Sequence, residues 1–419
     1  MPRFNTLPAW LAWQETLHPK KIDLGLQRVA AVAGRMGLLQ PDYAVITVAG
    51  TNGKGSSIAL LAAILGAAGY RTGSYTSPHL LRYNERISIA GQLASDDELC
   101  HAFDCVDRAR GQDTLSYFEF GTLAALHLFA AADLDIALLE VGMGGRLDAV
   151  NIIDPDAALV TSIDIDHSAW LGSDRETIGR EKAGIFRPER PAICADPAPP
   201  ASLEKTAAAL GASWFTLGRQ FSCNVNGTGW DWHGPDSSHL QLPPPALAGA
   251  QQFDNAAGVL MTLELLRERF PVSRKSIDAG LRTVSLAGRF QVVPGAVEVI
   301  LDVAHNPASG RRLAQMLGEL PASGNTWLVI GMLKDKDVAA FMASLAHTVD
   351  HWCLVSLDLD RGLSAAELRR MLPVMASDAH EFPNVAAASR YARGQAAAGD
   401  RVVVCGSFIT VAEAMSCHV

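Results

Sequence analysis

A glycine-rich loop at residues 50–57 contains the residue types that bind phosphate. Its sequence, Gly-Thr-Asn-Gly-Lys-Gly-Ser-Ser, follows the β-branched run Val45–Val48 and precedes an Ala- and Leu-rich segment that begins at Ile58. Glycine allows backbone N–H groups to converge on an anion, and the first turn of a following helix adds a positive dipole end. Lys54 adds a positive charge for the outer phosphates. The pattern therefore predicts a strand, a phosphate-binding loop and a helix.

The spacing of this loop differs from that of the standard P-loop. A valine stands five positions before Gly53, and Lys54 is followed by Gly55 rather than directly by Ser or Thr. We interpret the loop as a compressed variant, in which Ser56 or Ser57 supplies a hydroxyl near a metal ion. The alternative is a glycine-rich turn without a ligand. The strand and helix patterns on both sides favour the phosphate-binding interpretation.

Polar residues also follow other runs that read as parallel strands. Ser77, Glu140 and His167 each come just after such a run. Ligands of open parallel sheets bind beyond the carboxyl ends of the strands, so we expect these side chains around the phosphate site. An apolar strand that ends in an acid is typical of a Mg²⁺ site in P-loop proteins. Mg²⁺ is rarely bound by histidine, so His167 alone also fits a hydrogen-bonded loop residue.

Lys182 lies on the apolar side of a predicted helix over 175–186. At helical spacing it shares a face with Ile178, Ile185 and Phe186. Such a lysine either extends its amine to solvent along the apolar surface or keeps it desolvated. In the second case its pKa falls and the amine becomes reactive. The helix pattern leaves both interpretations open.

A second group of polar residues lies further along the chain. Asp302 and His305 follow a predicted strand that ends at Leu301, Arg289 precedes the same strand pair, and Asn255 begins a helix. Taken singly, each also fits an ordinary surface position. The place of Asp302 and His305 at a strand's carboxyl end makes them candidates for ligand binding.

The composition limits the classes of protein to which the chain can belong. It has 419 residues, 49% hydrophobic and 19% charged, and a formal net charge of −9. We expect two or three domains and no basic surface for nucleic acid. The seven cysteines are scattered without a CxxC pair, which favours free thiols over disulfides or a zinc site. No signal-peptide core or membrane-spanning run is visible, so we expect a cytoplasmic protein without a membrane partner.

The alternation of strand and helix patterns predicts an α/β protein with parallel sheets. We expect a P-loop ATPase domain over 1–287 and a smaller Rossmann-like α/β domain over 288–419. Residues 194–250 read as short antiparallel strands and loops at the edge of the first sheet. The hairpin Phe290–Val293 with Val297–Leu301 opens the second domain. The other predicted elements are helices at 7–17, 22–39, 118–132, 175–186 and 252–270, and strands at 72–77, 134–141, 157–165, 327–330, 352–356 and 401–405.

Several stretches together resemble the folylpolyglutamate synthases, the folate branch of the Mur-ligase superfamily. The resemblance covers about residues 20–410, and its first part, Asp23–Leu26, is most similar to bacterial members that are both dihydrofolate synthase and folylpolyglutamate synthase. The other stretches are Gly50–Ser56, Thr76–Leu80 with Glu85–Ile87, Tyr117–Thr122, Glu140–Ala149, Asp166–Gly172, Arg180–Phe186, Gly288–Phe290 and Asp302–Pro307.

The resemblance implies roles for the nucleotide and metal residues. Two Mg²⁺ ions are implied, with Lys182 converted to a carbamate (N6-carboxylysine) that assists the second. The implied catalytic residues are Lys54, Lys182 and His305. The implied ATP-binding residues are Thr51, Asn52, Gly53, Lys54, Gly55, Ser56, Asn255, Arg289 and Asp302. The implied metal ligands are Ser77, Glu140, His167 and Lys182.

The resemblance also implies the substrates. ATP would phosphorylate a carboxylate, and the amine of L-glutamate would displace phosphate from the acyl phosphate. The acceptors would be dihydropteroate and tetrahydrofolates, and the enzyme would be a monomer. A single-function folylpolyglutamate synthase and another Mur-type amino-acid ligase are the alternatives. The implied pterin-site residues are Asp23, Leu24, Gly25, Leu26, Ser116, Tyr117, Phe118, Glu119, Leu147, Asp148 and Ala149.

Overall fold

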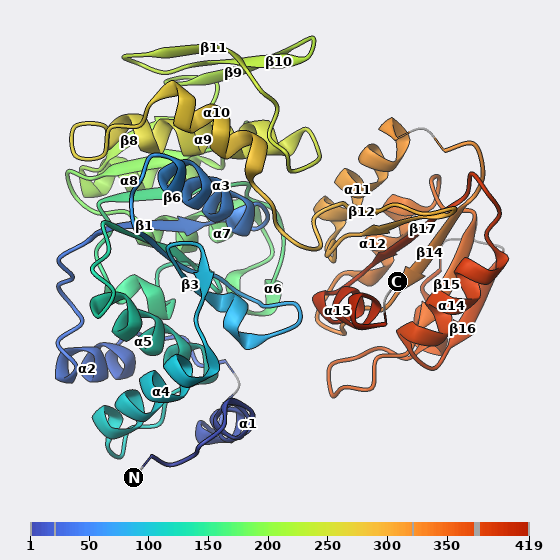
Figure 1. The fold of residues 1–419 in the computed structure, drawn as a ribbon, viewed down its shortest axis with the longest axis horizontal. Coiled ribbons are helices and arrows are strands. Elements are labelled where there is room, and N and C mark those ends of the chain that lie inside the picture. Colours follow the sequence, from blue (N-terminus) through green and yellow to red (C-terminus); the bar gives the residue numbers. More distant parts are fainter. Residues whose placement is uncertain (1, 21, 321, 373–377, 418–419) are drawn as a thin grey trace. The chain divides into compact units, whose positions relative to one another are not determined.

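The computed structural model describes residues 2–20, 22–320, 322–372 and 378–417. The chain forms two compact units, each built on its own sheet (Figure 1). The first comprises Met1–Ala246 and Ala250–Ser285, and the second Leu247–Gly249 and Leu286–Val419. Both alternate strands and helices, which confirms the predicted α/β fold class.

An eight-stranded sheet forms the centre of the first unit. Its strands are β1 (Ala44–Ala49), β2 (Thr72–Tyr75), β3 (Ile87–Ile89), β4 (Gln92–Leu93), β5 (Ile136–Glu140), β6 (Ala157–Val160), β7 (Pro191–Cys194) and β8 (Ser213–Thr216). The spatial order is β4-β3-β2-β5-β1-β6-β7-β8. From β2 to β8 the strands run parallel, and β3 and β4 form an antiparallel edge. All six residues of β1 are buried, as expected for a central strand covered on both faces.

Helices cover both faces of this sheet. On one face, the helix after the phosphate loop, α3 (Lys54–Ala67), packs against α9 (Gln251–Leu265) and α10 (Arg274–Thr283) (Figure 1). The other face carries the larger apolar core. The remaining helical segments of the unit are α1 (Leu7–Leu17), α2 (Gln27–Arg35), η1 (Tyr83–Arg86), α4 (Asp96–Arg110), α5 (Tyr117–Ala130), η2 (Ala149–Ile152), α6 (Ser168–Leu171), α7 (Arg175–Lys182), η3 (Ala183–Ile185) and α8 (Ala201–Leu210).

A separate antiparallel sheet follows β8. It consists of β9 (Ser222–Asn226), β10 (Gly229–His233) and β11 (Ser238–Leu242), in the order β11-β10-β9. Trp230 and Trp232 are fully buried, and their indole N–H groups donate to the carbonyls of Pro243 at 2.9 Å and Ala257 at 3.2 Å. The prediction of loops and strands at the edge of the main sheet was therefore wrong in part. The proline clusters hid the Ala-rich helix α8 and the parallel strand β8, and the antiparallel strands form their own sheet.

The second unit is built on a six-stranded sheet. Its strands are β12 (Gln291–Val293), β13 (Glu298–Leu301), β14 (Thr326–Ile330), β15 (His351–Val355), β16 (Ala379–Phe382) and β17 (Arg401–Cys405), in the order β12-β13-β17-β14-β15-β16. The predicted hairpin is present as β12 and β13, and the other pairs are parallel. The helices of the unit are α11 (Pro307–Glu319), α12 (Val338–Leu345), α13 (Ala365–Arg370), α14 (Val385–Gln395) and α15 (Phe408–Ser416).

Several predicted elements of the first unit were too long, among them the helix predicted at 252–270, which ends at Leu265. The helix predicted at 22–39 covers only 27–35, and the one at 175–186 ends at Lys182 and continues as a 3₁₀ turn. The strand predicted at 157–165 ends at Val160. The following residues leave the sheet because they bind the phosphate loop instead: the amide of Thr51 donates to the carbonyl of Ser162 at 2.7 Å.

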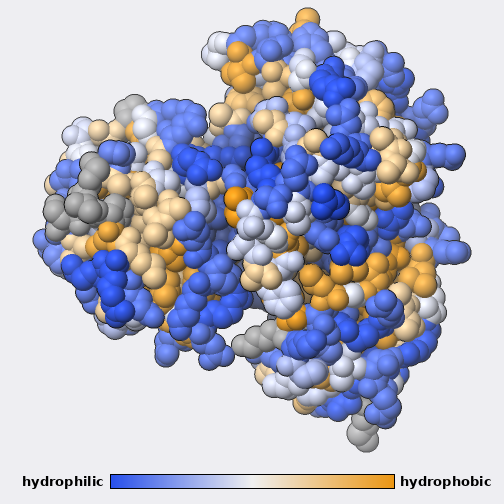
Figure 2. All heavy atoms as spheres, turned by 180° about the vertical axis from the view of Figure 1, so that it is seen from behind, coloured by the Kyte–Doolittle hydropathy of each residue, from blue (hydrophilic) through white to orange (hydrophobic). Residues whose placement is uncertain are grey.

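The surface is a mixture of polar and apolar side chains. Figure 2 shows hydrophilic side chains over most of one face, with smaller hydrophobic areas between them. Among the residues that the structure describes, no helix has both the length and the apolar character needed to cross a membrane. All seven cysteines lie in the described part of the chain and are free thiols, as predicted.

The contact between α3 and α10 leads to a stability prediction. A Cβ added at Gly280 would lie 2.7 Å from both the Cα and the backbone nitrogen of Ile64. We expect Gly280→Ala to lower the free energy of unfolding by about 1–3 kcal/mol, because the two helices must move apart. Gly66→Ala on α3 is the matched control, since its Cβ would meet nothing within 4 Å. It should raise the stability by about 0.5–1 kcal/mol through helix propensity. Urea unfolding measures both, and equal effects would contradict the packing argument.

Candidate active site

The phosphate loop is held by the segment that follows β6. A Cβ at Gly50 would lie 1.7 Å from the hydroxyl of Thr161, so only glycine fits there. The Thr161 hydroxyl donates to the carbonyl of Asn52 at 2.7 Å. The Thr51 hydroxyl donates to the carbonyl of Asp164 at 2.9 Å and lies 3.0 Å from its amide nitrogen. These contacts fix the loop before any ligand binds.

Two lysines meet at one carbonyl of this loop. The ammonium groups of Lys54 and Lys182 each lie 3.0 Å from the carbonyl oxygen of Gly50, to which both donate. Lys182 is only 4% exposed. Its pKa falls to about 7, first because of burial and then because of the neighbouring Lys54 charge, while Asp166 and Asp148 oppose the shift. The structure therefore supports the desolvated amine rather than one that extends to solvent.

Ser77 and Glu140 are brought together beside the loop. Glu140 pairs in register with Val48 on β1, so its carboxylate lies at the level where the loop begins. It is 5% exposed, and the amide of Ser77 donates to it at 3.2 Å. His167 precedes α6 with a positive φ of 51°, and its amide donates to the carboxylate of Asp166. The hydroxyl and carboxylate match the oxygen ligands that Mg²⁺ prefers, so these two residues fit the implied metal.

Asn255 contacts the same loop from α9. A Cβ at Gly53 would lie 2.5 Å from the Asn255 side-chain oxygen, and Gly53 has a φ of 94°. The Asn255 amide group donates to Gln252 at 3.0 Å, and Gln252 donates to the hydroxyl of Ser56 at 3.4 Å. Asn255 and Gln252 of α9 thus contact Gly53 and Ser56, which lie at the two ends of the turn that leads into α3.

Arg28 connects two of the segments that are candidates for pterin binding. Its guanidinium donates to the carboxylate of Asp23 at 2.8 Å and to Glu119 at 3.1 Å. The ring of His18 lies 3.1 Å from the Asp23 carboxylate, and it is the main cause of the lowered pKa of Asp23. Leu24, Gly25 and Leu26 are half-buried beside this group. The ion pair brings 23–26 next to the start of α5.

The start of α5 and the segment around Asp148 also lie together. Ser116 and Glu119 form a capping box at the first turn of α5. A Cβ at Gly142 would lie 2.6 Å from the ring of Phe118, so that ring packs against the turn after β5. The buried carboxylate of Asp148 accepts from the amides of Met143 and Val150, and burial raises its pKa to about 7. Leu147 and Ala149 flank it, and Tyr117 follows Ser116 in α5.

The candidate residues of the second unit form one cluster. The half-buried carboxylate of Asp302 accepts from the amides of Phe290 and Ala304, each at 2.8 Å. Burial raises its pKa, and the Arg289 guanidinium opposes that shift. Arg289 and His305 both lie against the ring of Phe408, at 5.2 and 6.1 Å. The structure therefore brings Arg289, Asp302 and His305 together at the carboxyl end of β13.

Sequence reasoning missed Arg28, Gln252 and Phe408. Each touches a candidate residue in the structure. For Gln252 a signal was present, since it lies three residues before Asn255 and therefore on the same face of α9. Arg28 lies five residues after Asp23, so a local signal was present for that pair, but its contact with Glu119 is distant in the sequence. Phe408 had no signal, because its partners Arg289 and His305 lie more than 100 residues earlier.

Comparison with known proteins agrees with this geometry. Residues 48–198 match the Mur ligase middle domain, and residues 288–408 match the glutamate ligase domain of Mur ligases. The dihydrofolate synthase/folylpolyglutamate synthase of Escherichia coli (strain K12) is 45% identical over 411 residues, which cover 98% of this chain and 95% of that protein. The chain belongs to the dihydrofolate synthase/folylpolyglutamate synthase family. The predicted family and the predicted enzyme class, an ATP-dependent ligase, are confirmed.

Solved structures of this family superpose over nearly the whole chain. The E. coli FolC complex with DHPP and ADP has a TM-score of 0.93 and 45% identity, and covers 98% of this chain and 97% of its own. A bifunctional folylpolyglutamate synthase/dihydrofolate synthase with Mn, AMPPNP and L-glutamate bound has the same TM-score and identity, and covers all of both chains. The predicted Mur-ligase-like fold is confirmed.

The contact between Gly53 and Asn255 predicts a specific defect in nucleotide binding. We expect Gly53→Ala to weaken ADP binding at least about tenfold, because a methyl group at this φ displaces Asn255 and reshapes the loop. Gly69→Ala is the matched control: its φ of 92° is nearly the same, but nothing lies within 4 Å of an added Cβ. It should lose about 1–2 kcal/mol of stability and keep its affinity for ADP. Calorimetric titration measures the affinities, and a normal value for Gly53→Ala would contradict the expected role of the loop.

Proposed function

We propose that the chain joins L-glutamate to dihydropteroate, forming dihydrofolate, and to the glutamate tail of tetrahydrofolates. The observation that carries the proposal is the convergence of Lys54 and Lys182 on the Gly50 carbonyl beside Glu140, in a member of this ligase family. The positive charge of Lys54 next to this loop suits the transfer of a phosphoryl group. The desolvated amine of Lys182 beside it is the group that we propose becomes a metal-binding carbamate. The relatives' complexes with ADP and with AMPPNP and L-glutamate support the same substrates.

The proposed reaction has two steps. A carboxylate oxygen of the acceptor attacks the γ-phosphorus of ATP, the bond to the bridging oxygen breaks, and ADP leaves. The amine of L-glutamate then attacks the acyl carbon, the carbon–oxygen bond to phosphate breaks, and the nitrogen loses a proton as the amide forms. Lys54 would stabilise the charge on the transferred phosphoryl group, and the loop amides of 51–56 would hold the other phosphates. We propose that His305 is also a catalytic residue, together with Lys54 and Lys182.

We propose Mg²⁺ as the divalent metal of this site, with two ions bound. Ser77, Glu140, His167 and a carbamate on Lys182 would hold them. The relative that binds Mn and AMPPNP supports a divalent metal next to the nucleotide. When bound, the ions would neutralise charge on the phosphates during the transfer.

The acceptor would bind beside the loop of residues 50–57. We propose that its pterin lies among Asp23–Leu26, Ser116–Glu119 and Leu147–Ala149. The aromatic ring of Phe118 offers a face for the pterin, and the Asp148 carboxyl, with its pKa of about 7, can accept or donate a hydrogen bond. Arg28 would act as a positioning residue, since it holds Asp23 next to Glu119.

We propose that three residues outside the loop of residues 50–57 also bind the nucleotide. Asn255 lies against Gly53 in the first unit. Arg289 and Asp302 in the second would bind the adenosine part of ATP. The half-buried Asp302 carboxylate suits a ribose hydroxyl or an adenine amine, both of which donate hydrogen bonds.

An assay of ADP release tests the function directly. With ATP, Mg²⁺ and L-glutamate, we expect turnover that requires either dihydropteroate or tetrahydrofolate, and mass spectrometry should find one glutamate added per ADP released. Turnover with tetrahydrofolate alone would leave a single-function folylpolyglutamate synthase. Turnover with neither acceptor would refute the proposal. Omission of L-glutamate is the control for simple ATP hydrolysis.

The lowered pKa of Lys182 predicts that its amine reacts with CO₂. At a pKa of about 7, about half of this amine is neutral at pH 7, against roughly one in three thousand for a lysine at 10.5. Reaction of the neutral amine with CO₂ gives a carbamate and a proton, which turns a cation into an oxygen ligand for Mg²⁺. We expect the ¹³C NMR signal of a labelled carbamate to grow as pH rises from about 6 to 8. No signal over this range would contradict the carbamate.

Two lysine variants test whether the carbamate forms at Lys182. Lys182→Arg should lose both the signal and nearly all activity, because guanidinium stays charged and forms no carbamate. Lys205→Arg changes an exposed lysine on α8 and should retain both. An active Lys182→Arg enzyme would show that the carbamate is not required.

A further inference from the structure

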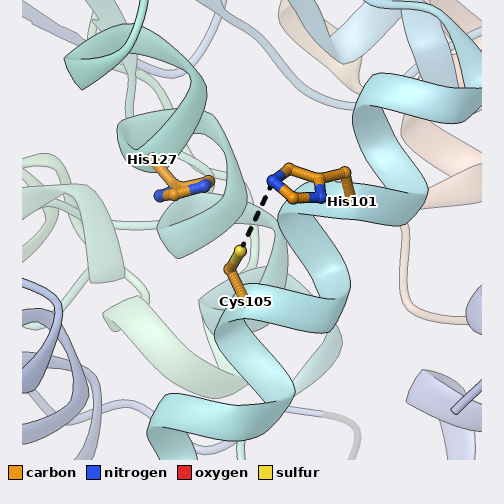
Figure 3. A group of neighbouring side chains, drawn as sticks. All are labelled: His101, Cys105 and His127. Atoms are coloured by element: carbon orange, nitrogen blue, oxygen red, sulfur yellow. Dashed lines mark hydrogen bonds between the residues drawn. The ribbon is translucent and has the colours of Figure 1, made fainter. Parts of the chain in front are cut away.

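Three metal-binding side chains meet at the surface of the first unit, on two neighbouring helices. His101 and Cys105 lie on α4, and His127 lies in the last turn of α5 (Figure 3). One ligand atom from each lies within 4.8 Å of the other two. Among the described residues this is the one cluster of its kind. None of the three belongs to the proposed nucleotide, metal or pterin site.

The spacing of the residues accounts for the cluster. His101 and Cys105 are four residues apart, so they lie one above the other on the same face of α4. That face packs against α5, which brings His127 to the same point. The sequence alone suggested no zinc site because it contains no CxxC pair, and the third ligand comes from a different helix.

The distances between the ligand atoms are somewhat longer than those of an occupied tetrahedral zinc site. Bonds of about 2.0–2.1 Å to nitrogen and 2.3 Å to sulfur place ligand atoms about 3.4–3.6 Å apart. The Sγ of Cys105 lies 3.8 Å from the Nε2 of His101. The ring centroids of His101 and His127 are 6.2 Å apart. Rotation of the side chains would have to shorten these separations when a metal ion binds.

We propose that His101, Cys105 and His127 bind one Zn²⁺ ion, or another metal of similar softness. Two imidazoles and a thiolate are ligands of Zn²⁺, whereas Mg²⁺ prefers oxygen. The cluster is therefore chemically distinct from the proposed site at Ser77 and Glu140. His101 is exposed and the other two are half-buried, so the ion can enter from solvent and keep a fourth position for water or a small ligand.

A bound ion would link α4 to the C-terminal end of α5. The opposite end of α5 carries Ser116 and Glu119, which we place in the pterin site. The metal would thus hold the helix that presents these residues, and it would not touch the substrate. Binding should be detectable as a rise in the melting temperature of the whole chain, because the ion would bind the folded form, where the three ligands meet, more tightly than the unfolded chain.

The test is a zinc titration of the full chain after removal of metal with a chelator. Competition with a chromophoric chelator, in excess Mg²⁺, should show one equivalent of tightly bound Zn²⁺. With Co²⁺ in place of zinc, the thiolate of Cys105 should give a sulfur-to-metal charge-transfer band. Cys105→Ser should abolish that band. His101→Ala and His127→Ala should each weaken zinc binding at least about tenfold.

Two control variants make the result specific. Cys100→Ser removes a half-buried thiol from the same helix but outside the cluster, and it should bind zinc normally. His167→Ala removes the imidazole of the proposed active site and should also leave the tight site unchanged. The proposal is overturned if no tight equivalent is found. It is equally overturned if the three cluster variants bind zinc as well as the controls do.

Discussion

The carbonyl oxygen of Gly50 accepts hydrogen bonds from two lysine side chains, and one of them comes from 132 residues further along the chain. Lys54 is the first residue of α3, and Lys182 is the last residue of α7, which follows β6 in the chain. Burial, and after it the nearby charge of Lys54, lowers the pKa of Lys182, so that the neutral form of its amine relieves the repulsion between the two groups. The loop, β6 and α7 must all be in place for this arrangement to exist.

The parallel sheet brings these groups together. Strands β2, β5, β1 and β6 are neighbours, so Ser77, Glu140, the phosphate loop and the Asp164–His167 segment all follow the same edge. The acidic groups there are mostly engaged by backbone amides, as at Glu140 and Asp148. These hydrogen bonds hold the carboxylates at fixed points, so a cation or phosphate bound at the proposed site would meet oriented partners with little rearrangement.

Local sequence was enough to predict the strand–loop–helix at 45–68 and the hairpin at 290–301, because glycine spacing and alternation act over a few residues. It could not predict the ion pair of Arg28 with Glu119, whose members are 91 residues apart. Nor could it predict the contact of Gln252 with Ser56, 196 residues apart. Strand β16 was missed since its sequence, Ala-His-Glu-Phe, is half polar and lies at a sheet edge. The motifs could be recognised in the sequence, whereas the long-range contacts could not be predicted from it.

The packing of α3 has a consequence for how the chain folds during synthesis. Ile58, Leu61 and Ile64 are buried, yet the helices that cover α3 lie about 200 residues later, at α9 and α10. At ribosomal rates of 5–20 residues per second, this apolar face waits about 10–40 s for its partners. The nascent first unit therefore exposes a surface suited to chaperone binding until residue 283 has emerged. The fold of the first unit and its proposed phosphate site are therefore completed at the same stage, because α9 also carries Asn255.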